Sequence, residues 1–265
     1  MYSKSQLFFK YLNYYLTASN SKGHGIHSPF VFEFITKVLN DSINYPAYTR
    51  VEKLRKQLLE DKFVLNIADL GAGSSVSKTD QRTVSSIARN AAKPKKLAQL
   101  LFRIIKFYQP STIIELGTSL GITSSYLSLA NPQARIITME GSKEIAATAQ
   151  QNFKNLDLKN IELMEGNFDD TLSSVVRSLS TVDFAFIDGN HRQEPTERYF
   201  QQLLSKINND SILVFDDIHW SKEMEAAWKT IKRHEAVRCT IDLFFIGVVL
   251  FRKEFKEKQH FVIRF

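Results

Sequence analysis

The stretch TIIELGTSLG, residues 112–121, decides the fold. It joins a short apolar run to a glycine-containing turn, and the helical pattern of residues 122–130 follows directly. A strand that enters a helix through a glycine turn is typical of the βαβ unit, which builds a parallel sheet. The same succession of apolar run and helical pattern repeats along the chain as far as residue 234.

Five short apolar runs alternate with five amphipathic segments, a pattern typical of a parallel sheet covered by helices on both faces. The runs are residues 112–116, 135–139, 161–164, 182–187 and 211–215, and the helices are expected near 122–130, 142–155, 169–179, 194–207 and 221–234. Two last apolar runs, 237–242 and 244–251, lie too close together for a crossover helix and predict an antiparallel pair. The fold class is therefore α/β: a Rossmann-like, doubly wound sheet of seven strands, mostly parallel, with a C-terminal antiparallel hairpin.

The part of the chain before this series has a different character. Mainly helical structure is predicted there, because apolar residues recur at helical spacing and because Ser28 and Pro29 are typical of a helix start. The helices are expected within residues 1–20, from Pro29 to Leu39, and near 48–61, 81–90 and 95–108. We therefore expect a helical N-terminal extension or lid over 1–95, a domain that contains the α/β sheet over 96–252, and a C-terminal tail over 253–265.

Composition excludes several classes of protein. The 265 residues are 43% hydrophobic and 24% charged, which excludes wholesale disorder and a disulfide-stapled miniprotein. Cys239 is the single cysteine, so no internal disulfide can form, as in proteins of a reducing cytosol. No apolar run reaches the roughly 18–20 residues of a membrane-spanning helix, and the N-terminus lacks signal-peptide features, so a cytoplasmic location is expected.

Charge is unevenly distributed along the chain. Residues 1–110 carry 17 basic and 7 acidic side chains, whereas residues 111–265 carry 18 and 21. A basic front half fits an anionic partner such as RNA, a phosphorylated metabolite or a membrane surface, and equally fits an ordinary solvated surface.

Ligands of doubly wound sheets bind beyond the carboxyl ends of the strands, so the residues at the strand exits are the site candidates. The first strand leads through Glu115 into Gly117, Thr118, Ser119 and Gly121, where glycines permit a sharp turn close to a ligand. The second strand ends at Glu140, 23 residues after Gly117, where an acid can accept both hydroxyls of a ribose.

Two further segments resemble parts of a nucleotide site. After the third strand, Asn167 and Phe168 offer an amide and a ring to an adenine, while Asp169 is also explained as a helix cap. The stretch Asp69–Gly73 carries a second glycine turn, but no amphipathic helix follows it. It is read as a loop turn, as a lid, or as the alternative nucleotide loop.

The fourth and fifth strands end in acidic residues. Asp188 is followed by His191, and Asp216 and Asp217 end the next strand. Three carboxylates at neighbouring strand ends repel one another unless a cation bridges them, and all-oxygen ligands favour Mg²⁺, Ca²⁺ or Mn²⁺. An imidazole, with an ordinary pKa of about 6.5, is a usable general base. The alternative is that Asp216 and Asp217 cap the helix beginning near Ser221 and that Asp188 contacts only the cofactor.

Together these residues resemble the class I S-adenosylmethionine-dependent methyltransferases. The similarity covers about residues 95–252. Within that superfamily the chain looks like the cation-dependent O-methyltransferases of the catechol type and their sugar-modifying relatives. Many of these relatives carry Lys at the base and Asp-Asn at the second metal pair, where this chain has His191 and Asp216-Asp217. Residues 1–95 look like an extension found in methyltransferase-like proteins of Bacteroidetes-type bacteria.

The resemblance implies roles for the residues already singled out. Glu115 and the loop Gly117–Gly121 would shape the methionine end of the S-adenosylmethionine site. Glu140 would hold the ribose, and Asn167 with Phe168 would flank the adenine. Asp188, Asp216 and Asp217 would bind Mg²⁺, and His191 would act as base, with Asp188 also beside the cofactor.

The expected reaction is methylation of a small-molecule hydroxyl. One alternative keeps the chemistry and takes RNA, specifically tRNA, as substrate, because the front half is basic. Another is a cofactor-binding scaffold without turnover, which would need neither Asp188 nor His191. Aromatic residues of the first helix are compatible with a homodimer or a lipid-like substrate.

Overall fold

The computed structural model describes residues 1–67 and 81–265, so the predicted Asp69–Gly73 loop lies outside the described part. The chain divides into two compact units. One unit is Asp41–Ser174, and the other combines Met1–Asn40 with Val175–Phe265. The boundary between the units therefore divides the expected 1–95 extension after Asn40, and the three-part organisation stays a prediction.

The unit Asp41–Ser174 contains a parallel three-stranded ladder with helices between its strands, as the alternating pattern predicts. In spatial order the strands are β3 (Thr112–Leu116), β4 (Arg135–Glu140) and β5 (Ile161–Glu165). The helices are α3 (Pro46–Glu60), α4 (Val84–Asn90), α5 (Lys95–Tyr108), α6 (Ile122–Ala130) and α7 (Lys143–Asn155). All of β3 after Thr112 is buried, which explains its continuous apolar run with a single acid inside.

The same unit has a short pair of strands that the apolar pattern does not predict. Strand β1 (Val64–Asn66) pairs antiparallel with β2 (Gln81–Thr83). Each strand has three residues, and Thr83 then caps α4 by accepting the Ser86 N–H at 3.2 Å. Three residues are too few to show an alternating pattern, so only the helix after them could be predicted.

The other unit contains five strands in the order β10-β8-β9-β7-β6. They are β6 (Phe184–Ile187), β7 (Ile212–Asp216), β8 (Cys239–Asp242), β9 (Ile246–Leu250) and β10 (Gln259–Val262). The first two pair in parallel, and β9 pairs antiparallel with both β7 and β8, so the predicted C-terminal hairpin is confirmed. The edge strand β10 pairs parallel with β8 and lies within the segment expected as a tail.

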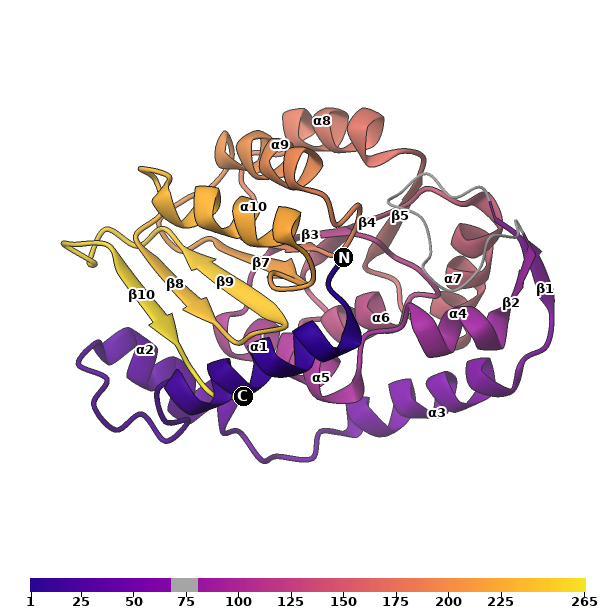
Figure 1. Ribbon diagram of the computed structural model, residues 1–265. Helices are drawn as coiled ribbons and strands as arrows, with labels where there is room; N and C mark the ends of the chain where they lie inside the picture. The colour runs from indigo at the N-terminus through magenta and orange to yellow at the C-terminus, as the bar shows by residue number, and fades with distance from the viewer. Residues whose placement is uncertain (68–80) are drawn as a thin grey trace. The chain divides into compact units, whose positions relative to one another are not determined.

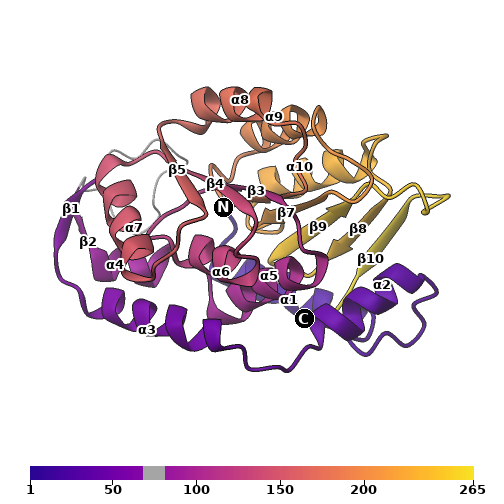
Figure 2. The same ribbon diagram turned by 180° about the vertical axis from the view of Figure 1, so that it is seen from behind.

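Helices of this unit come from both ends of the chain. They are α1 (Lys4–Thr17), α2 (Pro29–Glu33), the π-helix η1 (Phe34–Leu39), α9 (Gln193–Leu204) and α10 (Lys222–Arg233), while α8 (Phe168–Ser178) crosses the boundary between the units. Both views show α1 beside the C-terminal strands (Figures 1 and 2). The Ser19 N–H donates to the Val262 carbonyl at 2.8 Å, and the Arg264 N–H donates to the Ser19 carbonyl at 3.1 Å. The N-terminal segment is thus bound to the edge strand.

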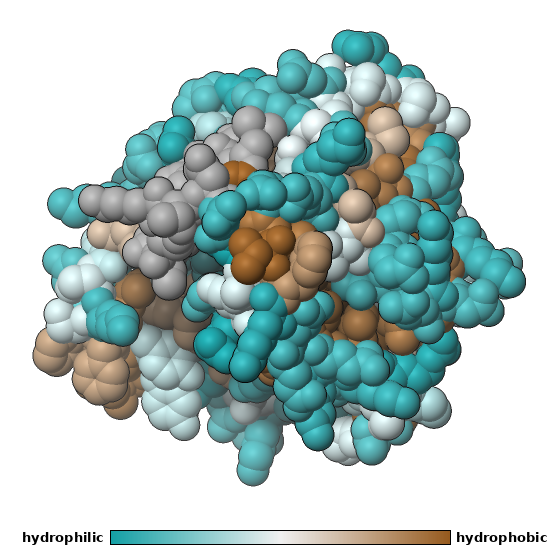
Figure 3. Space-filling view, turned by 90° about the vertical axis from the view of Figure 1, so that its right-hand side faces the viewer, coloured by the Kyte–Doolittle hydropathy of each residue, from teal (hydrophilic) through white to brown (hydrophobic). Residues whose placement is uncertain are grey.

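Surface and core follow the composition. On the face drawn in Figure 3, hydrophilic side chains predominate, and apolar side chains form small separate patches. Apolar side chains fill the interior of each unit, as expected for a chain with this hydrophobic fraction. Among the described residues, every helix is too short or too polar to cross a membrane.

Candidate active site

The loop after β3 is tightly bent and is bound to the end of β4. Gly117, Ser119 and Gly121 all have positive φ, at 104°, 48° and 80°. The N–H groups of Gly117 and Thr118 both donate to the Met139 carbonyl, at 3.1 and 3.0 Å. The predicted loop therefore has a fixed backbone, in the conformation that favours glycine at its two ends.

Gly121 serves the packing of two helices. A Cβ on this residue would lie 2.5 Å from Cε1 of Phe153, on α7. Because Gly121 is the N-cap of α6, its missing side chain allows the start of α6 to approach α7 closely. The glycine predicted as a cofactor contact is thus required in the first place by helix packing.

We expect Gly121→Ala to lower the free energy of unfolding by about 2–4 kcal/mol, because a new Cβ adds a collision to the strain of a positive φ. Gly25→Ala is the matched control: its φ is +79°, but a Cβ there has nothing within 4 Å. The control isolates the backbone strain, about 1–2 kcal/mol. Urea denaturation measures the free energy of unfolding of both variants. Equal losses, or no recovery on adding Phe153→Leu to Gly121→Ala, would contradict this role.

Glu140, the last residue of β4, connects the loops that follow β3 and β4. Its Oε2 accepts the Ser119 N–H at 2.9 Å, and its Oε1 accepts the Ser142 N–H at 3.0 Å. A carboxylate oxygen can accept a second hydrogen bond, so both oxygens can also accept from hydroxyl donors of a ligand. The acid is thus held in place by the loops that would surround a ribose.

Glu115 lies beneath the same loops and is completely buried. Its Oε2 accepts a hydrogen bond from the Thr138 hydroxyl at 2.7 Å and another from the Ser124 hydroxyl. Burial raises the pKa of Glu115 to about 7, and the nearby Glu140 charge acts in the same direction, against the two hydroxyl donors. Its Oε1 has no hydrogen-bond partner among the described residues.

The start of α8 is organised by Asn167 and not by Asp169. The Asn167 side-chain oxygen accepts the Asp169 N–H at 3.0 Å, and its carbonyl accepts the Thr171 N–H at 3.0 Å. The alternative that Asp169 caps the helix is therefore wrong, because Asp169 lies inside the first turn of α8 and the preceding Asn167 makes these contacts. Phe168 is the first residue of α8 and is half-buried. No structural finding tests the adenine role of Asn167 and Phe168.

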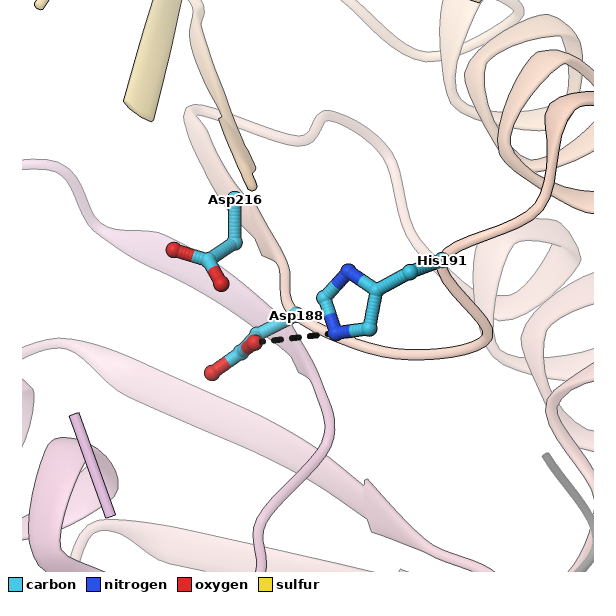
Figure 4. Close-up of side chains that lie close together, drawn as sticks. All are labelled: Asp188, His191 and Asp216. Atoms are coloured by element: carbon cyan, nitrogen blue, oxygen red, sulfur yellow. Dashed lines mark ion pairs between the residues drawn. The ribbon is translucent and has the colours of Figure 1, made fainter. Parts of the chain in front are cut away.

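In the other unit, Asp188 and His191 of the loop after β6 and Asp216 at the end of β7 form an acid–histidine group. Strands β6 and β7 pair in parallel with Ile187 opposite Phe215, so the next residues along, Asp188 and Asp216, follow at the same level. One side-chain ligand atom from each of the three residues lies within 4.8 Å of the others. The His191 Nε2 atom is 3.7 Å from the Asp188 Oδ1 atom (Figure 4).

Asp217 does not belong to this group. Its φ is +52°, and its N–H donates to the Phe245 carbonyl at 2.7 Å, so the chain turns sharply directly after β7. The helix-cap alternative for the two aspartates is also wrong, because the Ser221 hydroxyl accepts the Met224 N–H at 3.1 Å and caps α10. The group as the structure describes it contains two of the three predicted carboxylates and an imidazole, and the ligand role of Asp217 stays a prediction.

Some contributors to these sites could not be predicted from the sequence. Thr138 and Ser124 solvate Glu115, and Ser142 donates its N–H to Glu140. The registry of β3 with β4, which places Glu115 opposite Thr138, brings the first of them into contact. A threonine in an apolar run gives no signal of this by itself.

Part of the chain matches known methyltransferases in sequence. A family model described as a methyltransferase domain matches residues 114–218. A tRNA (guanine-N(7)-)-methyltransferase of Mycoplasma mobile is 34% identical over 77 residues, which are 29% of this chain and 38% of that protein. This chain thus matches well under half the length of that curated relative.

Solved methyltransferase structures have a similar fold. The SAH-bound methyltransferase PaMTH1 of Podospora anserina superposes with a TM-score of 0.60 at 12% identity, covering 85% of this chain and 97% of that one. An O-methyltransferase of Bacillus cereus in complex with SAH gives 0.57 at 16% identity, covering 83% and 97%. TomG, an O-methyltransferase of Streptomyces achromogenes in complex with SAM, gives 0.56 at 14%, covering 79% and 91%. Residues 114–218 thus match a methyltransferase domain, and the fold of the chain resembles that of these solved methyltransferases.

Proposed function

We propose that the protein transfers the methyl group of S-adenosylmethionine to a hydroxyl group of a small molecule, with the help of a divalent cation. The observation that carries this function is the acid–histidine group of Asp188, His191 and Asp216, at the ends of two paired strands of a methyltransferase domain. A scaffold without turnover would need no such group.

The residues of the unit Asp41–Ser174 suit the cofactor. S-adenosylmethionine carries an ammonium group and ribose hydroxyls, which are hydrogen-bond donors. Glu140 offers acceptor capacity on two fixed oxygens, and Glu115 has a buried oxygen without a partner among the described residues. Gly117–Gly121 would surround the methionine end, and Asn167 with Phe168 would flank the adenine.

Glu140→Gln is expected to weaken binding of S-adenosylhomocysteine by about 10–100-fold, the usual effect of losing a charge-assisted hydrogen bond. Glu162→Gln is the matched control, since Glu162 lies on β5 and pairs instead with Arg135, at 2.8 Å. Calorimetric titration gives both affinities. Equal affinities of the two variants would exclude Glu140 from the cofactor site.

The acid–histidine group has the donor chemistry for a hard divalent cation. Asp188 and Asp216 would supply carboxylate oxygens, which suit Mg²⁺ or Mn²⁺. A bound cation would polarise the acceptor hydroxyl and lower its pKa. Asp217, expected as a further ligand, is outside the group as the structure describes it.

The chain's own residues would then handle the proton. Methyl transfer forms a bond between carbon and the acceptor oxygen and breaks the sulfonium carbon–sulfur bond, and the hydroxyl proton must leave. The His191 imidazole would accept that proton as general base. The Asp188 carboxylate, 3.7 Å from its Nε2, would stabilise the imidazolium that forms.

The direct test uses S-adenosylmethionine labelled in its methyl group, with a panel of hydroxyl compounds and mass spectrometry of the products. Label on an oxygen, formed with Mg²⁺ or Mn²⁺ and lost with EDTA, is the expected result. Label on nitrogen would contradict O-methylation. Equal transfer with EDTA would contradict the role of the cation and leave the carboxylates as partners of His191 alone.

RNA methylation is a second candidate, favoured by the tRNA methyltransferase relative and by the basic residues 1–110. It requires binding that weakens steeply with salt, because phosphate contacts release counterions. Affinity for a tRNA that is unchanged between 50 and 200 mM salt, conditions over which such contacts lose about 10³–10⁵ in affinity, would exclude it. The homodimer and the cytoplasmic location stay predictions.

A further inference from the structure

Helix α1 has two apolar faces, one packed against the protein and one exposed. On the inner face, Tyr14 is buried, and Tyr11 packs with it against Phe244 of the turn between β8 and β9. The apolar stripe of a helix in a globular protein normally faces the core, so a second stripe on the outside calls for a partner. The exposed face carries five large apolar side chains: Phe8, Phe9, Leu12, Tyr15 and Leu16.

The exposed side chains lie next to one another because of their spacing. Residues four apart are neighbours on the surface of a helix. Phe8, Leu12 and Leu16 follow one another at this spacing, with Phe9 on one side of the row and Tyr15 on the other. Exposed apolar side chains that are scattered singly are ordinary, whereas a contiguous patch of them marks a surface that binds a protein or a membrane.

Contacts of the inner face hold the exposed row in a fixed direction. The Lys10 ammonium group pairs with Glu225 of α10 at 2.8 Å. Toward the end of the helix, the Tyr14 hydroxyl donates to the Ile263 carbonyl, directly after the edge strand β10. The helix is thus already folded and attached to its unit, so a partner of the exposed row would not have to order it first.

A cation lies at each end of the exposed row. Lys4 comes one turn before Phe8, at the start of the helix, and is exposed. At the other end, the Arg264 guanidinium group lies over the Tyr15 ring, 5.0 Å from its centroid. Residues 1–32 contain no aspartate and no glutamate. The row is therefore apolar in its middle and positive at both ends, with no acid on its own helix.

These charges favour one of two possible occupants. A second copy of the chain would pack this face against itself about a two-fold axis. The cations at the ends of the two rows would then approach each other, with no acid on either helix to offset their repulsion. A bilayer that contains anionic lipids instead offers apolar chains to the row and phosphate groups to the cations.

We propose that α1 is a membrane-docking helix, which lies in the plane of a bilayer containing anionic phospholipids and inserts its exposed apolar row between the headgroups. Helices of this kind bury their apolar face about 5–10 Å deep and combine Phe and Leu side chains with Lys and Arg. Tyr15 suits the same boundary, where amphipathic rings gather. This inference is independent of the proposed function, because α1 lies outside the matched residues 114–218.

The test is cosedimentation of the full chain with vesicles. One kind contains phosphatidylcholine alone, and the other is a two-to-one mixture of phosphatidylcholine and phosphatidylglycerol. We expect the wild type to bind the mixed vesicles more tightly than the neutral ones. The double variant Phe9→Ala/Leu16→Ala is expected to bind the mixed vesicles about 10–100-fold more weakly, because two large apolar side chains no longer enter the bilayer.

The matched control is the double variant Ile43→Ala/Phe63→Ala, in the unit Asp41–Ser174. Ile43 and Phe63 are 59% and 67% exposed, against 67% and 68% for Phe9 and Leu16, so neither double variant removes core packing. The control should bind the mixed vesicles within about twofold of the wild type, because its truncated side chains lie outside the row.

A lysine variant tests the charge separately. Lys4→Gln should weaken binding to the mixed vesicles about fivefold, the usual effect of losing one cation near an anionic surface, and leave binding to phosphatidylcholine unchanged. Lys62→Gln, which removes an exposed lysine of the other unit, is the control and should have little effect on either.

Loss of binding in Phe9→Ala/Leu16→Ala but not in its control, together with the preference for mixed vesicles, supports the inference. It is overturned if the wild type does not bind the mixed vesicles, if it binds both kinds equally, or if the two double variants behave alike. Light scattering tests the other occupant. A wild-type dimer that becomes a monomer in Phe9→Ala/Leu16→Ala would assign the row to a second copy of the chain and overturn the membrane assignment.

Discussion

His191→Ala is expected to lower kcat for methyl transfer by about 10²–10⁴-fold, the usual contribution of a general base. The imidazole is the proposed proton acceptor, and its Nε2 lies 3.7 Å from the Asp188 carboxylate. The KM for S-adenosylmethionine should stay within a factor of about three, because the cofactor residues proposed here lie on other strands. The measurement is steady-state kinetics with the acceptor identified by the labelling assay.

The exposed loop residue His24 provides the control. His24→Ala should leave kcat unchanged, since the sequence around it resembles a surface loop and nothing places it near the acid–histidine group. A kcat of His191→Ala within twofold of the wild type would remove the base role. A rise in KM with unchanged kcat would instead make His191 a binding residue.

The second large effect concerns the pH dependence of stability and comes from Glu115. Its pKa is raised from an ordinary 4.5 to about 7 by burial, so folding favours the protonated acid. The stability that Glu115 contributes is therefore fully present below pH 4.5 and is lost as the pH rises through 7. The glutamine in Glu115→Gln stays neutral at every pH. The free energy of unfolding of this variant, relative to that of the wild type, should therefore rise by about 3 kcal/mol between pH 4.5 and pH 7.5.

Urea denaturation of the two proteins at both pH values measures this gain as a difference, in which other titrating groups cancel. Glu162→Gln is the control, because the pKa of that exposed acid is lowered by its hydrogen bond to Arg135 and its small effect has the opposite sign. If the stabilities of Glu115→Gln and the wild type ran parallel with pH, the pKa of Glu115 would be the same in the folded and unfolded states, and its hydroxyl partners would offset burial.

The fold could be predicted where the local sequence pattern of a segment agrees with its burial in the tertiary structure. Strand β3 and helix α5 have apolar runs that fit their buried faces, and their bounds follow the pattern closely. Strands β1 and β10 were missed, because three or four residues carry no periodicity until a partner strand pairs with them. The π-helical Phe34–Leu39 was predicted as ordinary helix, since both have the same kind of apolar face.

The residues of the site could be predicted, because they lie at the ends of predicted strands. Their arrangement in space could not be predicted. Asp188 and Asp216 were found because acidic residues follow two apolar runs, and the parallel registry of β6 and β7 then brings them together. The positive φ of Asp217 has no sequence signal, because aspartate adopts the left-handed region only in particular turns. A pocket of about 300 Å³ is lined by Phe8 of α1 and by Phe245 of the turn between β8 and β9, and no local sequence pattern relates these two residues.

The central claim is that the chain binds the methyl-donor cofactor, and calorimetric titration of S-adenosylhomocysteine into the full chain tests it most directly. We predict one site per chain with a Kd in the micromolar range, in Mg²⁺ and in EDTA alike, because all of the proposed cofactor residues except Asp188 are separate from the acid–histidine group. Absence of binding heat together with an unchanged melting temperature would contradict the account of the Gly117–Gly121 loop and Glu140.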